Sequence, residues 1–441
     1  MHSLSEVTLK SNSYHKLNFD GGDMSSDAGL LLLKEFFSKM GFDCLLKQMF
    51  PISSHIKPRY HQEDENLLQV IYQLIAAYFE DDCADELTND PVFTAILGKD
   101  ALASQPTLSR FYHRMDQDTL AQFDRILKEL RKRVYACRKP EMILMDLDST
   151  LLETYGKQEG EGFNFHYHAH GYHPLICYDG LTGDLLSIKL RKGTVYSSNG
   201  VAEFLQPLLD EFQNDYPTTK LFLRGDSGFA TPELYTQCET NSTSYVVRLK
   251  ENSVLRTLSA DLDNELSETT RINTVDYAVV YGEFLYRAES WDYPRRVVCK
   301  VEKPTGQLVH MLTFIVTNMD LPPAQIVRLY CNRGSMENLI KEGKNGFDFA
   351  GVSSRSEVVN ANRLQIRALA YNLFNWFKRL VLPKEMRKCM VDTIRLKLIK
   401  IAARIVRSAR YVTFKLCSSY PYKREFLKIL ENIQGLRPLL L

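Results

Sequence analysis

The spacing of apolar and polar residues divides the chain into helical flanks and a mixed centre. Before residue 139 the apolar positions recur at helical intervals, for example in the leucine-rich run 30–37, which follows a helix-start signal at 25–27. Similar patterns span about 63–79 and 120–134, and the latter is rich in charged residues. The first third of the chain is therefore predicted to be mostly helical.

After Pro140 short apolar runs replace the helical spacing. Met142–Met145 and Leu221–Leu223 are wholly apolar, and each is followed by polar residues, as is typical of buried central strands. Residues 250–318 alternate between apolar and polar positions and predict a β meander, whereas everything from Asn362 onward is predicted to be helical. The chain is thus predicted to be an α/β protein with helical flanks.

Composition adds the broad class. With 44% hydrophobic and 25% charged residues, the chain is ordinary for a globular protein, which excludes collagen-like and wholly disordered chains. No apolar run approaches the ~18 residues of a membrane-spanning helix, so we expect no membrane partner. Nine cysteines without a Cys-x-x-Cys spacing favour reduced thiols and a cytoplasmic location.

The near-neutral net charge of +1 conceals a basic end. Residues 361–441 carry 18 Lys and Arg against 4 Asp and Glu, which is +14, so the first 360 residues carry +1 − 14 = −13. Such a basic block on an acidic chain predicts a polyanionic partner, nucleic acid before membrane. A solvated basic face of a helical region is the alternative explanation.

One basic stripe is predicted within this block. On a helix from about 394 to 410, four cations at offsets 0, 3, 7 and 10 share one face; they are Lys397, Lys400, Arg404 and Arg407. We expect them to contact DNA phosphates without reading sequence. The alternative is a basic solvent face over a packed helix.

Two of the apolar strands lead into carboxylates. Asp148, or Asp146 two residues before it, follows the first strand, and Asp226 follows a later one. Carboxylates at the ends of neighbouring central strands can converge on one hard cation, because Mg²⁺ prefers oxygen ligands. Asp is also common after a strand as a turn or helix-cap residue, so this pair alone leaves both explanations open.

A third carboxylate lies in a polar helical stripe. On one continuous helix the positions of Tyr330, Arg333, Glu337 and Lys344 fall within an arc of about 60°. Glu337 would then complete a carboxylate triad, while Arg333 and Lys344 would present cations to phosphate along the same face. The alternative is a solvated helix with a Glu337–Lys341 pair.

This stripe resembles the signature of bacterial insertion-sequence DDE transposases, in which Tyr, Arg, Glu and Lys are separated by two, three and six residues. Other segments resemble the group 1 DDE-domain transposases in the same order along the chain. These segments are 104–111, 158–164 through 171–175, 224–229 and 402–407. The resemblance covers nearly the whole chain.

The resemblance implies an RNase H-like catalytic core in which the first Asp follows the first strand, the second Asp follows the fourth, and the Glu lies on a later helix. Asp148, Asp226 and Glu337 are the implied catalytic residues and metal ligands. The implied contacts to the DNA backbone near the cut are Tyr330, Arg333, Lys341 and Lys344. Asp148 is preferred to Asp146 because it precedes a small residue and Thr, and Asp146 is kept as a further carboxylate of the metal site. Two Mg²⁺ ions are implied, with Mn²⁺ as a substitute.

The implied reaction is metal-dependent cleavage at insertion-sequence ends and strand transfer into target DNA, with water and then a DNA 3′-hydroxyl as nucleophile. The implied partners are double-stranded DNA, both the terminal inverted repeats and the target, and a second copy of the chain when DNA ends are bound. The location is the bacterial cytoplasm, at the nucleoid when DNA is bound.

The resemblance also assigns functions to the regions of the chain. Residues 1–139 are a mostly helical DNA-binding or dimerisation region, and 140–249 are the first part of the core. Residues 250–320 are a β-rich insertion, and 321–361 are the core helix that bears the Glu. Residues 362–441 are a basic helical C-terminal region.

Two other functions fit parts of the sequence. The run Asp146-Leu147-Asp148-Ser149-Thr150 resembles the first motif of haloacid dehalogenase-like phosphatases, with Asp146 as nucleophile, but the second acid of their late Mg²⁺ loop is replaced by Ala230. A transposase-derived DNA-binding protein without catalysis is the other alternative, although all three acids are present.

Overall fold

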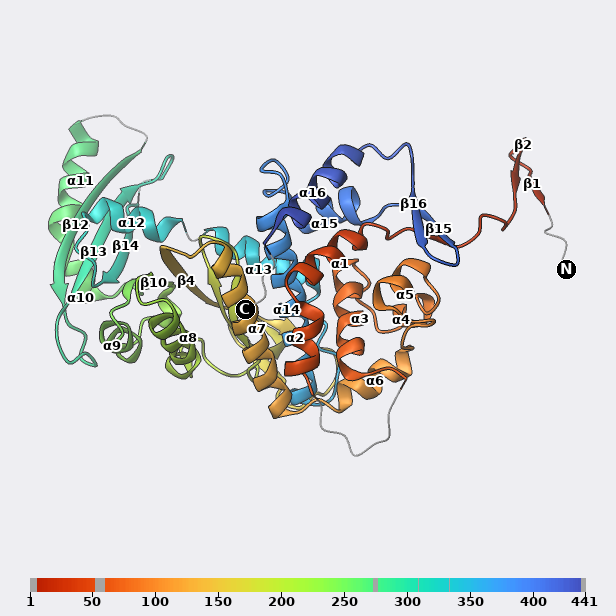
Figure 1. The fold of residues 1–441 in the computed structure, drawn as a ribbon. Coiled ribbons are helices and arrows are strands. Elements are labelled where there is room, and N and C mark those ends of the chain that lie inside the picture. Colours follow the sequence, from red (N-terminus) through yellow and green to blue (C-terminus); the bar gives the residue numbers. More distant parts are fainter. Residues whose placement is uncertain (1–5, 52–59, 273–276, 308, 333, 438–441) are drawn as a thin grey trace. The chain divides into compact units, whose positions relative to one another are not determined.

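The structure is a computed structural model that describes residues 6–51, 60–272, 277–307, 309–332 and 334–437, and it divides into two units (Figure 1). The first unit comprises 1–138, 342–351 and 361–441, and the second comprises 139–341 and 352–360. Two helices, α13 (Gly334–Phe347) and α14 (Glu357–Val381), each contribute residues to both units.

The second unit is built on an eight-stranded mixed sheet (Figure 1). In spatial order its strands are β12 (Ala278–Tyr286), β13 (Arg295–Lys303), β14 (Met311–Thr317), β11 (Ser244–Leu249), β10 (Lys220–Gly225), β4 (Met142–Ser149), β8 (Leu175–Asp179) and β9 (Leu185–Lys189). The neighbours β4, β10 and β11 run parallel, whereas the other neighbouring pairs are antiparallel. Along the chain β4 is the first strand of this sheet and β10 is the fourth. The predicted α/β class with an RNase H-like core is therefore confirmed.

Helices and a small second sheet complete this unit. The helices are α8 (Val201–Asp215), α9 (Pro232–Thr240), α10 (Ser253–Leu258), α11 (Ala260–Ile272) and α12 (Pro323–Cys331), with a 3₁₀ turn, η1, at Ser227–Phe229. The small sheet has the order β5 (Leu152–Glu153), β7 (Ala169–Tyr172) and β6 (Gly162–Asn164).

The predicted β meander is only partly correct. Residues 253–272 form α10 and α11, and the strands begin at Ala278. Helix α11 lies along β12 and β13 (Figure 1). Leu262 of this helix fits closely over Gly282, where an added Cβ would collide with the leucine. Burial of this apolar helix face explains why the segment is helical. The strands β12–β14 continue the core sheet beyond β11.

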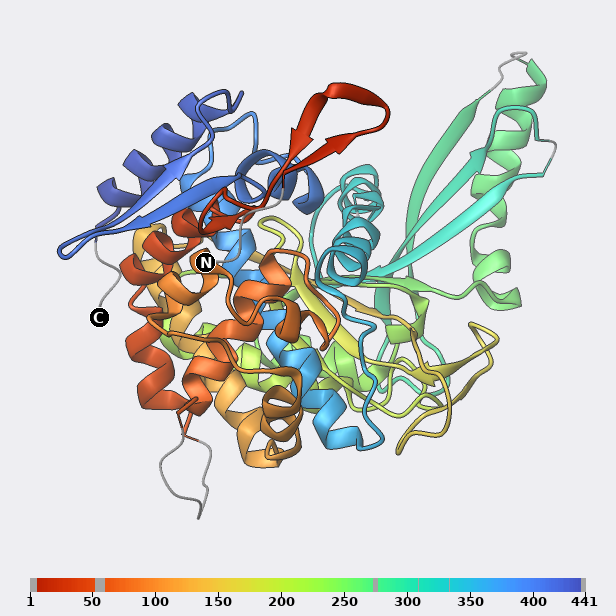
Figure 2. The same ribbon diagram turned by 90° about the vertical axis from the view of Figure 1, so that its right-hand side faces the viewer.

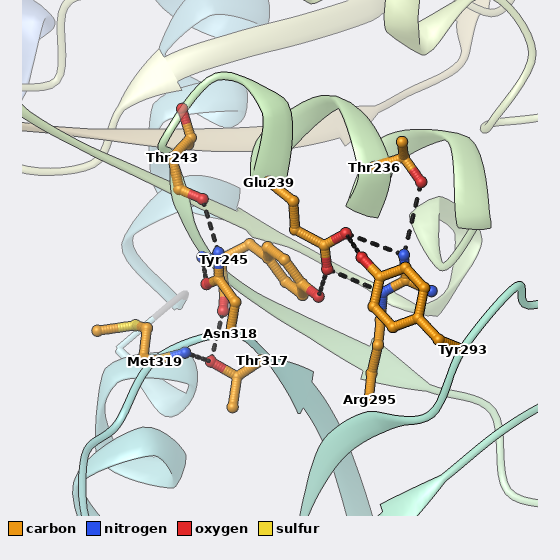
Figure 3. A network of polar contacts seen from close by, with 9 residues as sticks. All are labelled: Thr236, Glu239, Thr243, Tyr245, Tyr293, Arg295, Thr317, Asn318 and Met319. Carbon is orange, nitrogen blue, oxygen red and sulfur yellow. Dashed lines mark hydrogen bonds and ion pairs between the residues drawn. The ribbon is translucent and has the colours of Figure 1, made fainter.

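Polar contacts hold these added strands to the core (Figure 3). Arg295, at the start of β13, donates to both carboxylate oxygens of Glu239 on α9, at 2.9 and 3.0 Å. Tyr245 on β11 donates its hydroxyl to the same carboxylate at 2.8 Å, and Thr317 on β14 donates to the Tyr245 carbonyl at 2.7 Å. One network of buried and half-buried side chains thus connects α9, β11, β13 and β14.

The first unit is mostly helical. Its helices are α1 (Leu30–Lys39), α2 (Phe42–Met49), α3 (Glu63–Ile75), α4 (Cys83–Glu86), α5 (Pro91–Leu97), α6 (Gln105–His113), α7 (Gln117–Cys137), α15 (Val391–Ile394) and α16 (Lys423–Gly435). Strands β1 (Val7–Leu9) and β2 (Asn12–Leu17) form a hairpin, and β3 (Met24–Ser25), β15 (Ala403–Arg407) and β16 (Val412–Leu416) form a sheet. Helix α14 supplies the core of this unit, where Phe377 meets Phe36 edge-on at 5.6 Å.

The prediction of a helix from 394 to 410 is wrong. After α15 the chain makes a π-helical turn, η2 (Arg395–Ile399), and then forms β15, which pairs with β3 and β16. Residues 403–407 fit a helical repeat and also a two-residue repeat, in which Ala403 and Ile405 are buried and Arg404 is exposed. Pairing on both sides of β15 selects the strand.

No helix in the described ranges is both long enough and apolar enough to span a lipid bilayer.

Candidate functional site

A buried ion pair joins the two strands that lead to the candidate carboxylates. Asp146 on β4 and Arg224 on β10 are register partners in the parallel ladder. Both nitrogens of one guanidinium edge, Nε and Nη2, donate to the Asp146 carboxylate at 2.6 Å, and the two side chains are 0% and 1% exposed. Asp146 is therefore committed to a structural contact inside the sheet, and a metal in solution has no access to it.

Asp148 and Asp226 occupy the next positions toward the strand ends. Asp148 lies two residues after Asp146, and Asp226 lies two residues after Arg224 in extended conformation. Side chains two residues apart in a strand point to the same face, and neighbouring strands lie about 4.8 Å apart. The two half-buried carboxylates consequently stand at the same level, on the same face and on neighbouring strands.

Residues of the loop between β9 and α8 join the two strand ends. The hydroxyl of Ser149, next to Asp148, is 3.0 Å from that of Ser197. On the other side Gly228, whose amide donates to Asp226 at 2.8 Å, leaves room for Ser197: a Cβ on Gly228 would lie 3.2 Å from the Ser197 Cβ. Ser197 thus fills the space between the two aspartate-bearing segments.

Tyr167 lies beside both aspartates. Burial raises the pKa of its phenol to about 12, and the negative charges of Asp148 and Asp226 add to that rise. The protonated hydroxyl donates to the Ser149 carbonyl at 3.2 Å. Tyr167 therefore stays neutral at physiological pH and supports the end of β4.

Sequence reasoning missed Arg191, a buried cation just after β9. Its Nε donates to the His173 carbonyl at 3.0 Å, and its Nη1 donates to the carbonyls of Ser197 and Asn199 at 3.2 and 2.7 Å. It thereby orders the loop that carries Ser197. An Arg beside an apolar strand has no distinctive sequence pattern, so this role depends on the folded loop.

The predicted polar stripe does not lie on one helix. Tyr330 is in α12, which ends at Cys331, whereas Glu337 and Lys344 are in α13, which begins at Gly334. Asn332 and Gly334 favour a helix end, because both are poor helix formers. Arg333 lies outside the described residues.

The helices α12 and α13 are nevertheless tied to the ion-paired part of the sheet. Arg224 donates from Nη1 to the Leu329 carbonyl of α12 at 2.7 Å. Tyr178 of β8, the ladder partner of Asp146, donates to the Leu339 carbonyl of α13 at 3.4 Å. Glu337 itself is exposed in the first turn of α13, between the buried residues Met336 and Ile340.

The acidic residues fit a cation site only in part. Asp148 and Asp226 offer hard oxygen ligands from neighbouring strand ends, as Mg²⁺ requires. Among the described residues, however, no three His, Cys, Asp or Glu side chains are grouped closely enough to hold a metal ion. The structure therefore places two of the three predicted carboxylates, Asp148 and Asp226, at neighbouring strand ends, and among the described residues it does not gather all three into one group.

The predicted DNA contacts around Glu337 have different environments. The ring of Tyr330 packs on an apolar cluster that includes Val298 and Ile326. Lys341 is exposed on α13, and Lys344 is half-buried. Of the two described lysines among these predicted contacts, Lys341 is the more exposed.

The basic stripe of the C-terminal region is also divided by the structure. Lys400 forms an ion pair with buried Asp27 at 2.6 Å, and Lys397 lies over the Tyr422 ring at 5.1 Å. Arg404 and Arg407 are exposed on β15. The single helical stripe is therefore wrong, and its members separate into internal contacts and exposed cations.

Residues 7–438 match the model of the family described as transposase DDE domain, group 1. No curated protein matches the chain at a significant level.

Two solved structures are similar to parts of the chain. One is the piggyBac transposase synaptic complex with hairpin DNA, at 14% identity over 85% of this chain and 80% of that chain, with a TM-score of 0.42. The other is the Mos1 transposase paired-end complex with the left transposon end, at 13% identity over 49% and 68% of the two chains, with a TM-score of 0.18.

Proposed function

The chain belongs to group 1 of the transposase DDE domain family, and we propose that it cuts DNA at the ends of an insertion sequence and joins them to target DNA. The observation that carries this proposal is the placement of Asp148 and Asp226 at one level, on the same face of neighbouring parallel strands. Asp148 lies in β4, the first strand of the sheet along the chain, and Asp226 directly follows β10, the fourth.

Each acidic residue has a role in this proposal. Asp148 and Asp226 hold Mg²⁺, for which Mn²⁺ can substitute, and Glu337 is assigned as the third ligand through its match to the family signature. Mg²⁺ held by these residues would supply activation of the attacking hydroxyl and neutralisation of charge on the phosphate. Asp146 is left out of the metal site, because Arg224 already holds both of its oxygens.

The same ion pair argues against the phosphatase alternative. That reaction needs Asp146 as a nucleophile, and a nucleophile must reach its substrate. Asp146 is 0% exposed and accepts two hydrogen bonds from Arg224. We therefore retain the transposase function, and we propose that the DNA partners are the terminal inverted repeats and the target duplex, bound by a homodimer in the bacterial cytoplasm.

Cleavage of a duplex that carries the element's own ends tests the acidic residues. In Mg²⁺, wild type should release 3′-hydroxyl ends, and Asp226→Asn and Glu337→Gln should each lower the rate by at least about a hundredfold while still binding the duplex. Asp261→Asn and Glu268→Gln, exposed on α11, make the same charge changes and should cut normally.

The possible results separate the parts of the proposal. Cutting that survives Asp226→Asn would show that the paired-aspartate site is misassigned. Loss of activity in Asp226→Asn but not in Glu337→Gln would show that Glu337 is not a metal ligand and would leave the two aspartates in that role. A wild-type protein that binds the ends and never cuts them would favour the catalytically inactive DNA-binding protein.

A further inference from the structure

Strands β15 and β16 form a hairpin in the first unit, called the ribbon below (Figure 2). All of its charged residues are basic. Its exposed charged residues are Arg404, Arg407, Arg410 and Lys415. The sequence between Asp392 and Glu425 contains no Asp or Glu. Within the described parts of the chain, none of these four cations forms an ion pair. The positive charge of the ribbon is therefore not neutralised by a neighbouring carboxylate of the described protein.

The two faces of the ribbon differ. Ala403 and Ile405 on one face are buried, and their ladder partners on β16 are half-buried. On the other face Arg404 stands directly opposite Lys415. Like charges directly opposite each other destabilise a strand pair, so this face is unfavourable in the protein alone, and an anion that bridged both cations would relieve the repulsion.

The tip of the ribbon is an ordered loop. The amide of Ser408 donates to the Tyr411 carbonyl at 2.9 Å, and the Tyr411 amide donates to the Ser408 hydroxyl at 3.1 Å. The loop 408–411 thereby projects Arg410 and the Tyr411 ring, which is 70% exposed, into solvent. A fixed tip with an arginine and an aromatic ring is suited to contact with bases rather than to diffuse attraction.

We propose that the β15–β16 ribbon lies in the major groove of the duplex at the element end, an inference that rests on the proposed function. Two strands about 4.8 Å apart, with their side chains, fit a groove about 12 Å wide. Arg404 and Lys415 contact phosphates, which positions the ribbon, and Arg410 at the tip donates to base edges, which reads sequence.

Binding of the full-length protein to three labelled duplexes tests this placement. The duplexes are the terminal inverted repeat, a base-shuffled DNA of equal length, and an RNA duplex with the repeat sequence. Two ribbon variants are compared with wild type across a salt series: Arg404→Gln with Lys415→Gln, and Arg410→Gln. The matched control is Lys423→Gln with Arg424→Gln, which removes two exposed cations from the first turn of α16.

The two ribbon variants should fail in different ways. Loss of Arg404 and Lys415 should make the plot of log affinity against log salt shallower, by about 2 in slope, on both DNA duplexes. The reason is that each phosphate contact releases about 0.9 counterion. Arg410→Gln should lower the preference for the repeat over shuffled DNA by about tenfold or more. The control pair should change neither quantity, and no variant should melt below wild type, since loss of the facing Arg404 and Lys415 charges removes a repulsion.

Several results would overturn the ribbon proposal by itself. One is an unchanged salt slope in the Arg404 and Lys415 variant, and another is an equal change of slope in the control pair. A third is binding of the RNA duplex that depends on the ribbon as strongly as DNA binding does, because the deep and narrow major groove of RNA excludes the ribbon. Asp226→Asn separates this outcome from failure of the proposed function, because it should stop cutting while leaving the salt slope intact. A wild type that does not prefer the repeat would count against both.

Discussion

At the scale of single residues, Asp146 and Asp148 show how two carboxylates on one strand acquire different roles. Asp146 is fully buried and held by Arg224, whereas Asp148 is half-buried at the strand end and level with Asp226. A buried ion pair tolerates the loss of one partner poorly, because the remaining charge stays buried without compensation. The two residues should therefore respond differently to the same substitution.

We predict that Asp146→Asn lowers the free energy of unfolding by about 3–5 kcal/mol, because Arg224 is left buried without its counter-charge. Asp148→Asn should change stability by less than about 1 kcal/mol and should abolish cleavage instead. Urea denaturation of each variant measures the free energy of unfolding, and the cleavage assay measures the activity. Equal stability of the two variants would contradict the structural role of Asp146.

At the scale of elements, the start of α1 depends on a close approach to the π-helical turn η2. The amide of Gly29 donates to the Ile399 carbonyl at 3.1 Å, and the Ala28 amide donates to the Ile401 carbonyl at the same distance. A Cβ at position 29 would lie 1.7 Å from the Leu398 carbonyl oxygen. Only glycine permits this contact between segments nearly 370 residues apart in the sequence.

Gly29→Ala should destabilise the protein by about 1–3 kcal/mol, even though its backbone is helical and alanine is the better helix former. The backbone of η2 must move to admit the methyl group. Gly435→Ala at the end of α16, where nothing lies within 4 Å of the added Cβ, is the matched control and should be neutral. A shift in the denaturation midpoint confined to Gly29→Ala is the expected result; identical midpoints would show that the contact adjusts without cost.

At the scale of the whole molecule, the candidate chemistry and the basic ribbon belong to different units of one chain. Asp148, Asp226 and Glu337 are in the second unit, whereas β15 and β16 are in the first. Metal binding and the salt dependence of DNA binding should therefore be separable by mutation. Each can be lost while the other is kept.

Addition of Mg²⁺ should raise the melting temperature of wild type, because a cation that binds the folded protein stabilises it by about 2.7 kcal/mol at a hundred times its dissociation constant. The double variant Asp148→Asn with Asp226→Asn should lose this shift, whereas Asp261→Asn should keep it. Thermal melting with Mg²⁺ and with a chelator makes the measurement without DNA. A shift that survives in the double variant would place the cation elsewhere.

The sequence by itself determined the class of the fold, the family and the carboxylates that end β4 and β10. Wholly apolar runs are typical of strands buried on both faces, and the polar residues that follow them lie at the ends of those strands. The family signature depends on residue identity and spacing, which are properties of the chain alone. Most of the helices in residues 1–139 follow for the same reason, since their amphipathic period is local.

Only the tertiary structure decided which Asp faces solvent, where the helices near Glu337 break, and that residues 403–407 form a strand. Asp146 and Asp148 have the same parity on the same strand, so their environments differ only because Arg224 reaches one of them from β10. Residues 403–407 fit two periods, and pairing with β3, which precedes them by almost 380 residues, selects one. Such choices depend on partners distant in sequence, and a local pattern carries no information about them.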